Sequence, residues 1–409
     1  MLEHLFPKAH AQYSESANGF LLDEFAGWLM SSGYSPQAAC GHVRRLRQAL
    51  DRMTPASAAC DIGISASSVS RAFRLWRAQK TFRATRRAFE RFLVVRGRLI
   101  QTPKSDRFAL LLDSYRRYLE EVRGLAAATI EQHIVTTRHF LADALSSEAL
   151  FEDLSARAVE QFVVTEGRRI KRQSLQHIVA HLRAFLRFCF DQAILRDRLD
   201  TIDAPRVYRG ELPPRSLAWS LVQQLLRSID RSHQLGWRDY AILHLMAHYG
   251  LRPSEIVTLT LESIDWQAKT LSVQQRKTRS DLILPLTSQT VGILSRYLQR
   301  GRRAGPHREL FLRGKSPAGA LTRSGVGKLY RTRAQQSGLP LHGTSCYCLR
   351  HSFAMRLLDR GVGIKLIGDL LGHRSLESTC VYLRLQIGTL RDVALPLPPP
   401  VVRIVEDAA

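Results

Sequence analysis

Apolar residues recur at helical steps along most of the chain. From Leu175 to Cys189, for example, apolar side chains stand three or four positions apart, which is typical of a helix with one buried face. Proline, glycine and charged residues interrupt this pattern at 101–106 and at 202–214. The pattern predicts two helical bundles, followed by a third segment of different character.

The first two segments resemble each other in sequence. LDEFAGWLMSSGYS from Leu22 recurs in altered form as LDSYRRYLEEVRGLA from Leu112, and RAFERFL from Arg87 recurs as RAFLRFC from Arg183. The two motifs are separated by 65 residues in one copy and by 71 in the other. We therefore expect a duplicated helical module, with chance similarity between two arginine-rich amphipathic helices as the alternative.

From about Ser216 the chain combines segments with helical spacing and segments with the alternating spacing of strands. SLAWSLVQQLLRSI and WRDYAILHLMAHYG predict helices, the second of which ends at Gly250. Pro253 suits the first turn of the next helix and places Arg252 at its start. Two alternating runs, TLSVQQ and DLILPL, flank KTRS and predict a β-hairpin with Lys277 at its tip.

Three consecutive short helices are expected near the end of this segment. CLRHSFAMRLL predicts the first, GIKLIGDLL the second, which ends at Gly372, and SLESTCVYLR the third, which Ser375 could cap. Arg350, His373 and Tyr382 lie on or beside these three elements. A compact helical domain could therefore bring the three side chains to one point.

The charge balance indicates a polyanionic partner. The chain has 60 Lys and Arg against 36 Asp and Glu, which gives a formal net charge of +24. Arginine is spread along nearly every helical segment, so a nucleic acid is the expected partner, with a merely basic soluble protein as the alternative, and binding should weaken steeply with salt.

One part of the first segment is especially basic. GISASSVSRAFRLWRAQ from Gly63 resembles the second half of a helix-turn-helix, although an ordinary packing helix is the alternative. A stripe of positive charge follows, and we expect it to contact phosphates rather than read bases, because a stripe does not specify hydrogen-bond geometry. Its members are Arg71, Arg74, Arg77, Lys80, Arg83, Arg86 and Arg87, and Arg279 in the hairpin turn is a further DNA-binding candidate.

Other features limit the cofactors and the compartment. The six cysteines are scattered and are expected to be reduced, and Cys346 and Cys348 lack a second Cys/His pair with zinc-ligand spacing. We therefore expect no metal and no cofactor. No apolar run approaches the roughly 20 residues that cross a bilayer, and the N-terminus lacks the order of a signal peptide. A cytoplasmic protein without a membrane partner is expected.

The order of the motifs resembles that of the tyrosine recombinases, the family of phage integrases and Xer-type chromosome-resolving enzymes. YGLRPSEI, QQRKTRSDLILPL, CLRHSFAMRLL and LLGHRSLESTCVYLR carry the resemblance, with Tyr382 nine residues after His373 and Lys277 eight residues before Pro285. The resemblance covers roughly residues 108 to 390. It implies a mainly α fold, in which helical DNA-binding modules precede a mixed α+β catalytic domain with a small antiparallel sheet.

The same resemblance implies a domain order and an assembly. It predicts an extra N-terminal helical DNA-binding module (1–102), a helical core-binding domain (107–201), a catalytic integrase domain (212–392) and a proline-rich tail (393–409). The protein would recombine DNA at specific sites during integration or excision of a mobile element. It would act as a synaptic tetramer on DNA, and companion recombinases are candidate further partners.

The resemblance also assigns chemical roles. Arg252 and Arg350 match the paired arginines that hold the scissile phosphate, and Lys277 matches the general acid for the departing 5′-oxygen. His373 would hydrogen-bond the phosphate or the nucleophile. Tyr382 would attack and form a 3′-phosphotyrosyl link, whose retained energy makes a metal or nucleotide unnecessary for religation.

Glu255 follows the family pattern, whereas Tyr347 departs from it. Glu255 matches the acid that the family carries three residues after its first arginine, whereas Tyr347 stands where the family usually has a histidine. A phenol is a poor base near neutral pH, so Tyr347 could either act directly or simply pack. His351 is expected to pack or support rather than replace that histidine, because successive helix residues point in different directions.

Two other functions share this fold. One is a DNA-binding accessory or regulatory protein, against which the retention of Tyr382 and both arginines argues. The other is a type IB topoisomerase, which has the same chemistry without strand exchange and is disfavoured by the expected core-binding module.

Overall fold

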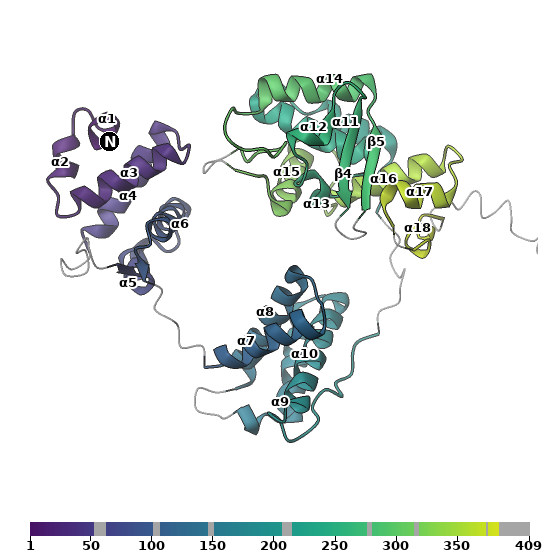
Figure 1. The fold of residues 1–409 in the computed structure, drawn as a ribbon, viewed down its shortest axis with the longest axis horizontal. Coiled ribbons are helices and arrows are strands. Elements are labelled where there is room, and N and C mark those ends of the chain that lie inside the picture. Colours follow the sequence, from purple (N-terminus) through teal and green to yellow (C-terminus); the bar gives the residue numbers. More distant parts are fainter. Residues whose placement is uncertain are drawn as a thin grey trace, which may run out of the picture. The chain divides into compact units, whose positions relative to one another are not determined.

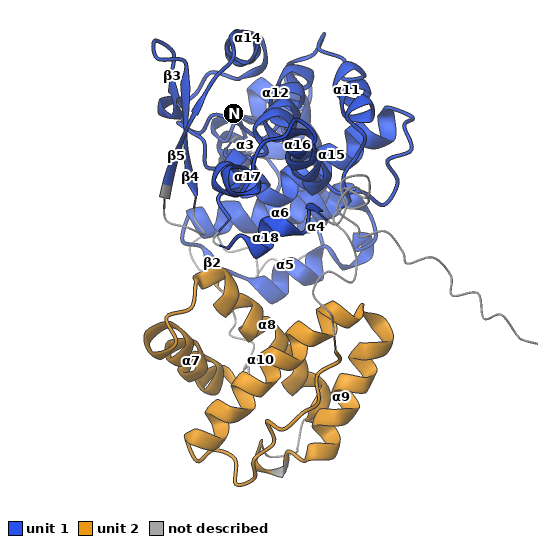
Figure 2. Cartoon of the chain, turned by 90° about the vertical axis from the view of Figure 1, so that its right-hand side faces the viewer, with its two compact units in different colours: residues 1–99, 212–409 blue, residues 100–211 orange. Residues whose placement is uncertain are grey.

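The computed structural model is mostly helical and contains a small three-stranded antiparallel sheet, which confirms the predicted fold class (Figure 1). None of the helices in the described part of the chain is long and apolar enough to cross a membrane. Figure 2 colours two compact units, residues 100–211 and residues 1–99 with 212–409. The domain boundaries expected from the sequence stay a prediction. The structure describes residues 1–52, 63–100, 107–145, 151–206, 215–275, 280–314, 319–373 and 375–383.

The N-terminal module has its own hydrophobic core and a two-stranded sheet that the sequence pattern did not predict. The sheet forms because the Ile64 amide donates to the Arg98 carbonyl, a pairing between residues far apart in sequence. Serine hydroxyls cap two of the helices, Ser35 for α4 and Ser65 for α5. The elements are α1 (Leu2–Leu5), α2 (His10–Ser14), α3 (Gly19–Ser31), α4 (Pro36–Leu50), β1 (Ile64–Ser65), α5 (Ala66–Ala72), η2 (Arg74–Trp76), α6 (Lys80–Val95) and β2 (Leu99–Ile100).

The second module packs around the long helix α10, whose apolar positions predicted its buried face. Helices α8 and α9 both contact α10. The elements are α7 (Ala109–Arg117), η3 (Tyr118–Val122), α8 (Ala127–Ala144), η4 (Phe151–Asp153), α9 (Ala156–Arg169) and α10 (Arg172–Asp191).

The cores of these two modules contain the same arrangement of four aromatic rings. Phe25 meets Phe89 edge-on at 5.6 Å, and Tyr115 meets Phe185 edge-on at 5.1 Å. The other three ring pairs also recur at matching steps from the repeated motifs. The two sets are Phe25, Trp28, Phe89 and Phe92, and Tyr115, Tyr118, Phe185 and Phe188. Matched packing at matched positions supports the predicted duplication.

A polar contact between the second and last long helices also recurs. Arg45 on α4 donates to the Thr85 hydroxyl of α6 at 2.9 Å. Thr136 on α8 lies 3.0 Å from Nδ1 of His181 on α10. Arg45 and Thr136 each lie ten positions after the N-cap residue of their helix. Thr85 and His181 each lie two positions before the repeated arginine. The residue types differ, but the positions are equivalent, so chance similarity no longer accounts for the repeat.

The third part of the chain surrounds the buried helix α12. Strands β3, β4 and β5 form an antiparallel sheet in that order, and β4 and β5 are the predicted hairpin. The elements are α11 (Trp219–Arg227), α12 (Gln234–Tyr249), α13 (Pro253–Ile256), η5 (Leu261–Ser263), β3 (Ile264–Asp265), β4 (Thr270–Gln275), β5 (Ser280–Pro285), α14 (Ser288–Arg296), η6 (Tyr297–Gly301), α15 (Arg323–Gln336), α16 (Tyr347–Leu358), α17 (Ile364–Leu371) and α18 (Glu377–Cys380).

The expected helix ends are mostly present. Gly250 ends α12 and Gly372 ends α17, both in the left-handed conformation. The expectation that Ser375 caps the last helix is wrong, because the N-cap of α18 is Leu376 and it makes no side-chain cap hydrogen bond. The Ser375 carbonyl instead accepts from the amide of Ser378, so this residue contributes through its backbone.

Candidate active site

Arg252 is fixed by its position at the start of α13. Pro253 occupies the first helical turn, and the Glu255 carboxylate accepts from both the backbone amide and the guanidinium of Arg252, each at 2.7 Å. A further guanidinium nitrogen donates to the Gly372 carbonyl at 3.2 Å. The RPSE sequence therefore holds the arginine side chain in one orientation.

Arg350 is buried on α16, with 5% of its surface exposed. It donates to the Gly250 carbonyl at 2.7 Å and to the Leu371 carbonyl, so two helix C-terminal ends stabilise its charge. Nη1 lies 4.0 Å from the Glu255 carboxylate. Burial, aided by the charge of Arg252, lowers the pKa of Arg350 to about 10, which leaves it positive at neutral pH.

Gly372 brings the hairpin and His373 together. Its φ is +59°, and a Cβ there would lie 1.8 Å from the Gln275 side-chain oxygen, so no other residue fits without displacing its neighbour. The Nδ1 atom of His373 lies 2.8 Å from the Thr379 hydroxyl. Burial and the nearby charge of Arg350 lower the pKa of His373 to about 4. The imidazole is therefore neutral at neutral pH.

Tyr382 is also buried beside these groups, with 2% of its surface exposed. Its ring lies nearly parallel to that of His373 at a centroid distance of 6.5 Å, and its hydroxyl lies 3.0 Å from Nδ1 of His351. Burial raises the pKa of Tyr382, although Arg350 and Arg252 act in the opposite direction. Burial lowers the pKa of His351, so a neutral imidazole and a protonated phenol lie within hydrogen-bond distance of each other.

The structure thus brings together Arg252, Glu255, Arg350, His373 and Tyr382. The direct contact between His351 and Tyr382 was not foreseen, because it joins residues 31 positions apart. The parts played by Thr379, Gln275 and the Gly250 carbonyl were also missed, because they depend on how separate elements pack.

Tyr347 occupies a different environment from the other candidates. It begins α16, is 45% exposed, and its hydroxyl makes no hydrogen bond within the described residues. Its phenol is close enough to Arg350 to affect the pKa of that guanidinium. Tyr347 is therefore a partly open neighbour of the site rather than a core residue.

The predicted lysine and one predicted arginine cannot be placed. Lys277 and Arg279 lie outside the described residues. The last residue of β4, Gln275, lies against Gly372, so this strand of the hairpin ends beside the site.

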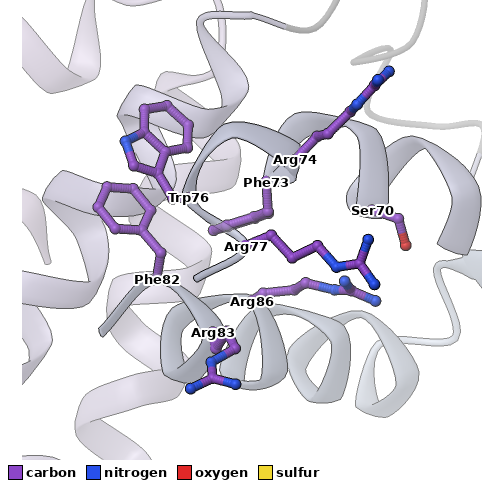
Figure 3. A pocket seen from close by; sticks show the side chains of 8 residues that line it. All are labelled: Ser70, Phe73, Arg74, Trp76, Arg77, Phe82, Arg83 and Arg86. Carbon is purple, nitrogen blue, oxygen red and sulfur yellow. The ribbon is translucent and has the colours of Figure 1, made fainter. Parts of the chain in front are cut away.

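The basic residues of the N-terminal module divide into two groups. Helix α5 ends at Ala72 and a separate 3-10 turn follows, so the predicted stripe does not lie on one continuous helix. Arg74, Arg77, Arg83 and Arg86 line one pocket (Figure 3). Arg71, Lys80 and Arg87 are exposed elsewhere on the module.

The part of the chain that contains this site is similar in sequence to known proteins. Residues 216–387 match the phage integrase family. The chain is 31% identical over 290 residues to the integrase/recombinase y4rA of Sinorhizobium fredii, covering 70% of each chain. It is 30% identical over 284 residues to the tyrosine recombinase XerD of Lacticaseibacillus casei, covering 67% of this chain and 94% of that one.

Solved structures show the same fold. The Tn1549 transposon integrase in complex with transposon right end DNA aligns with a TM-score of 0.54 at 16% identity, over 69% of this chain and 99% of that one. The XerH site-specific recombinase bound to palindromic difH substrate aligns with a TM-score of 0.53 at 17% identity, over 69% and 83%. Together with the sequence relatives, the match identifies this chain as a member of the tyrosine recombinases of the phage integrase family.

Proposed function

We propose that this protein is a site-specific DNA recombinase that cleaves and rejoins strands through a 3′-phosphotyrosyl intermediate on Tyr382. The observation that carries the proposal is the meeting of Arg252, Arg350, His373 and Tyr382, which come from four separate elements. Two cations beside a phenol suit attack on a phosphodiester, because the phosphorane gains negative charge.

The two arginines would hold the non-bridging oxygens of the scissile phosphate. Glu255 and the carbonyls of Gly250, Leu371 and Gly372 fix their positions before DNA binds. Each guanidinium has five N–H donors in a rigid fork, which matches phosphate geometry. Donors fixed in advance need little reorganisation as charge develops.

Proton transfers would accompany the exchange of bonds. The Tyr382 oxygen forms a bond to phosphorus while the bond from phosphorus to the 5′-oxygen breaks. His351 would accept the phenolic proton, since its neutral imidazole already contacts the hydroxyl. Lys277 would donate a proton to the departing 5′-oxygen. Religation reverses these steps, and the retained phosphodiester energy makes a nucleotide or metal unnecessary.

Double-stranded DNA is the proposed partner. The net charge of +24 supports it, as do the similar proteins whose structures were solved with DNA. A tetramer would join two DNA sites, and companion recombinases would be further partners. The biological outcome would be integration or excision of a mobile element.

Covalent capture tests this function. The wild-type chain and Tyr382→Phe are incubated, with EDTA present, with nicked duplexes taken from the DNA that flanks the gene. We expect the wild type to become attached to DNA and the variant to bind without attachment.

Two other results would contradict the proposal. Equal binding with no attachment by either protein would favour the accessory function. Efficient relaxation of a supercoiled plasmid that lacks any flanking sequence would favour a topoisomerase.

A further inference from the structure

The two helical modules differ at one face of their last helix. The face is defined by the positions four and one before, and three after, the repeated arginine, which is Arg87 in α6 and Arg183 in α10. These three positions are charged in α6 and apolar in α10. The pairs are Arg83 and Val179, Arg86 and Leu182, and Glu90 and Leu186. Elsewhere the modules keep the same ring cluster and the same polar contact. The change is therefore local to one face of a shared framework.

In the second module this face is part of the core. Val179, Leu182 and Leu186 are fully buried, and helix α9 packs against α10 with Val159 and Phe162 in the same cluster. Burial of apolar side chains stabilises a fold. The charged residues at the matching positions of α6 cannot make that contribution, so this face of α6 is expected to serve another purpose.

In the N-terminal module the same face lines an open pocket. Its volume is about 450 Å³, and it lies between α6 and the segment formed by α5 and η2. Figure 3 shows the Arg77 and Arg86 side chains extended alongside each other, with Arg83 on the same helix as Arg86. Phe73 and Phe82 are buried and contribute apolar wall. The remaining lining residues are Ser70, Arg74 and Trp76.

The positive charges of the pocket are poorly compensated. Arg86 pairs with Glu90 at 2.7 Å, whereas Arg74, Arg77 and Arg83 make no ion pair within the described residues. The guanidinium groups of Arg77 and Arg86 lie alongside each other in Figure 3, and two like charges side by side repel one another unless an anion is bound. Two oxygens of one phosphate can accept two parallel hydrogen bonds from a planar guanidinium group, so a phosphate suits these arginines.

The aromatic wall is already occupied by internal contacts. The Trp76 ring stacks on Phe82 at 4.5 Å with an interplanar angle of 7°, and the Arg52 guanidinium carbon lies 5.0 Å from the Trp76 centroid. A ring engaged by two neighbours offers little room for a stacked base. The chemistry of the pocket therefore favours a phosphate over an unpaired nucleobase.

We propose that this pocket, at the face where α6 differs from α10, binds a backbone phosphate of double-stranded DNA. The identity of the polyanion rests on the proposed function. The exposed Arg44 and Arg96 of the same module lie outside the pocket and belong to no candidate DNA contact.

The test compares two double variants of the full chain that lose equal charge. Arg77→Gln with Arg83→Gln alters the pocket, and Arg44→Gln with Arg96→Gln, at two exposed positions of the same module outside the pocket, is the matched control. Fluorescence anisotropy with a duplex of arbitrary sequence gives the dependence of the binding constant on salt. Each lost phosphate contact lowers the slope of log K against log salt by about 0.9. We expect a slope lowered by about 1–2 for the pocket variant and an unchanged slope for the control.

Two outcomes would overturn this inference. Equal losses in both variants would mean a uniform cationic surface, and no loss in the pocket variant would exclude DNA from the pocket. In the second case a polyglutamate peptide, tested as a ligand, would distinguish an acidic protein partner. The slopes do not depend on strand cleavage, so failure of covalent capture would refute the proposed chemistry and leave the pocket result standing.

Discussion

The hydroxyl of Tyr382 lies 3.0 Å from Nδ1 of His351, the proposed acceptor of the phenolic proton. We predict that His351→Gln slows covalent capture by about 10²–10⁴-fold, the usual contribution of a positioned proton acceptor. Glutamine can hydrogen-bond the phenol but cannot take its proton. Single-turnover capture at saturating DNA measures the effect, and an unchanged rate would assign His351 to packing alone.

The pH dependence of capture follows from the same pair. Burial lowers the pKa of His351 below its ordinary value of 6.5, and burial lowers that of His373 to about 4. Both imidazoles are therefore neutral at pH 7, and the wild-type rate should fall only as the pH drops below 6.5. A rate that already falls between pH 8 and pH 7 would contradict this assignment.

Tyr347 offers a second residue-level test. Its phenol is partly exposed near Arg350, at the position where the family usually has a histidine. We expect Tyr347→His to raise the cleavage rate, because an imidazole adds a proton acceptor that works near neutral pH. A fall in rate would show that the site has adapted to the phenol.

The sequence predicted which residues of the site would meet but not every contact among them. Arg252 was placed at a helix start by the following proline, which is a local effect. The contact of Tyr382 with His351 joins the residues after α18 to α16, 31 positions away in the chain, and no local pattern encodes it.

At the scale of elements, the glycine that ends α12 does more than close a helix. Gly250 has a φ of +65°, and a Cβ there would lie 2.6 Å from Phe353, whereas Gly338 has a φ of +66° and open space around it. We predict that Gly338→Ala destabilises the fold by about 1 kcal/mol, and Gly250→Ala by about 2–4 kcal/mol. Urea unfolding measures both, and equal losses would show that the backbone conformation alone matters.

The Asp239 carboxylate joins two helices of the same part. It accepts from Arg238 on α12 and Arg333 on α15, both at 2.7 Å, and is buried. We predict that Asp239→Asn destabilises the fold by about 3–5 kcal/mol, because two cations lose their partner. Asp51→Asn is the control, since that exposed carboxylate lies 4.0 Å from Arg47, and its loss should have an effect below about 0.5 kcal/mol.

Local signals explain which elements were foreseen. The β4–β5 hairpin and the helix ends at Gly250 and Gly372 follow from alternation and from glycine. The β1–β2 pair was missed, because it joins residues 64 and 98 of the chain. The break between α5 and η2 was missed because the spacing of arginines resembles that of one helix.

At the scale of the whole molecule, buried histidines link stability to pH. Burial lowers the pKa of His42 and of His133 to about 4, and that of His244 to about 3. These groups bind protons in the unfolded chain before the folded one, so their contribution is complete above pH 6.5 and is lost as the pH falls toward 4. Urea unfolding between pH 7 and pH 4 should show a declining free energy, and a flat profile would contradict the burial of neutral imidazoles.

The burial of Tyr382 has a consequence for the order of events on DNA. With 2% of its surface exposed, Tyr382 is covered in the conformation described. Under the proposed function its phenol would have to become accessible before it attacked a phosphate, so DNA binding would precede exposure of the nucleophile. Nitration by tetranitromethane should accordingly spare this ring until a duplex is engaged.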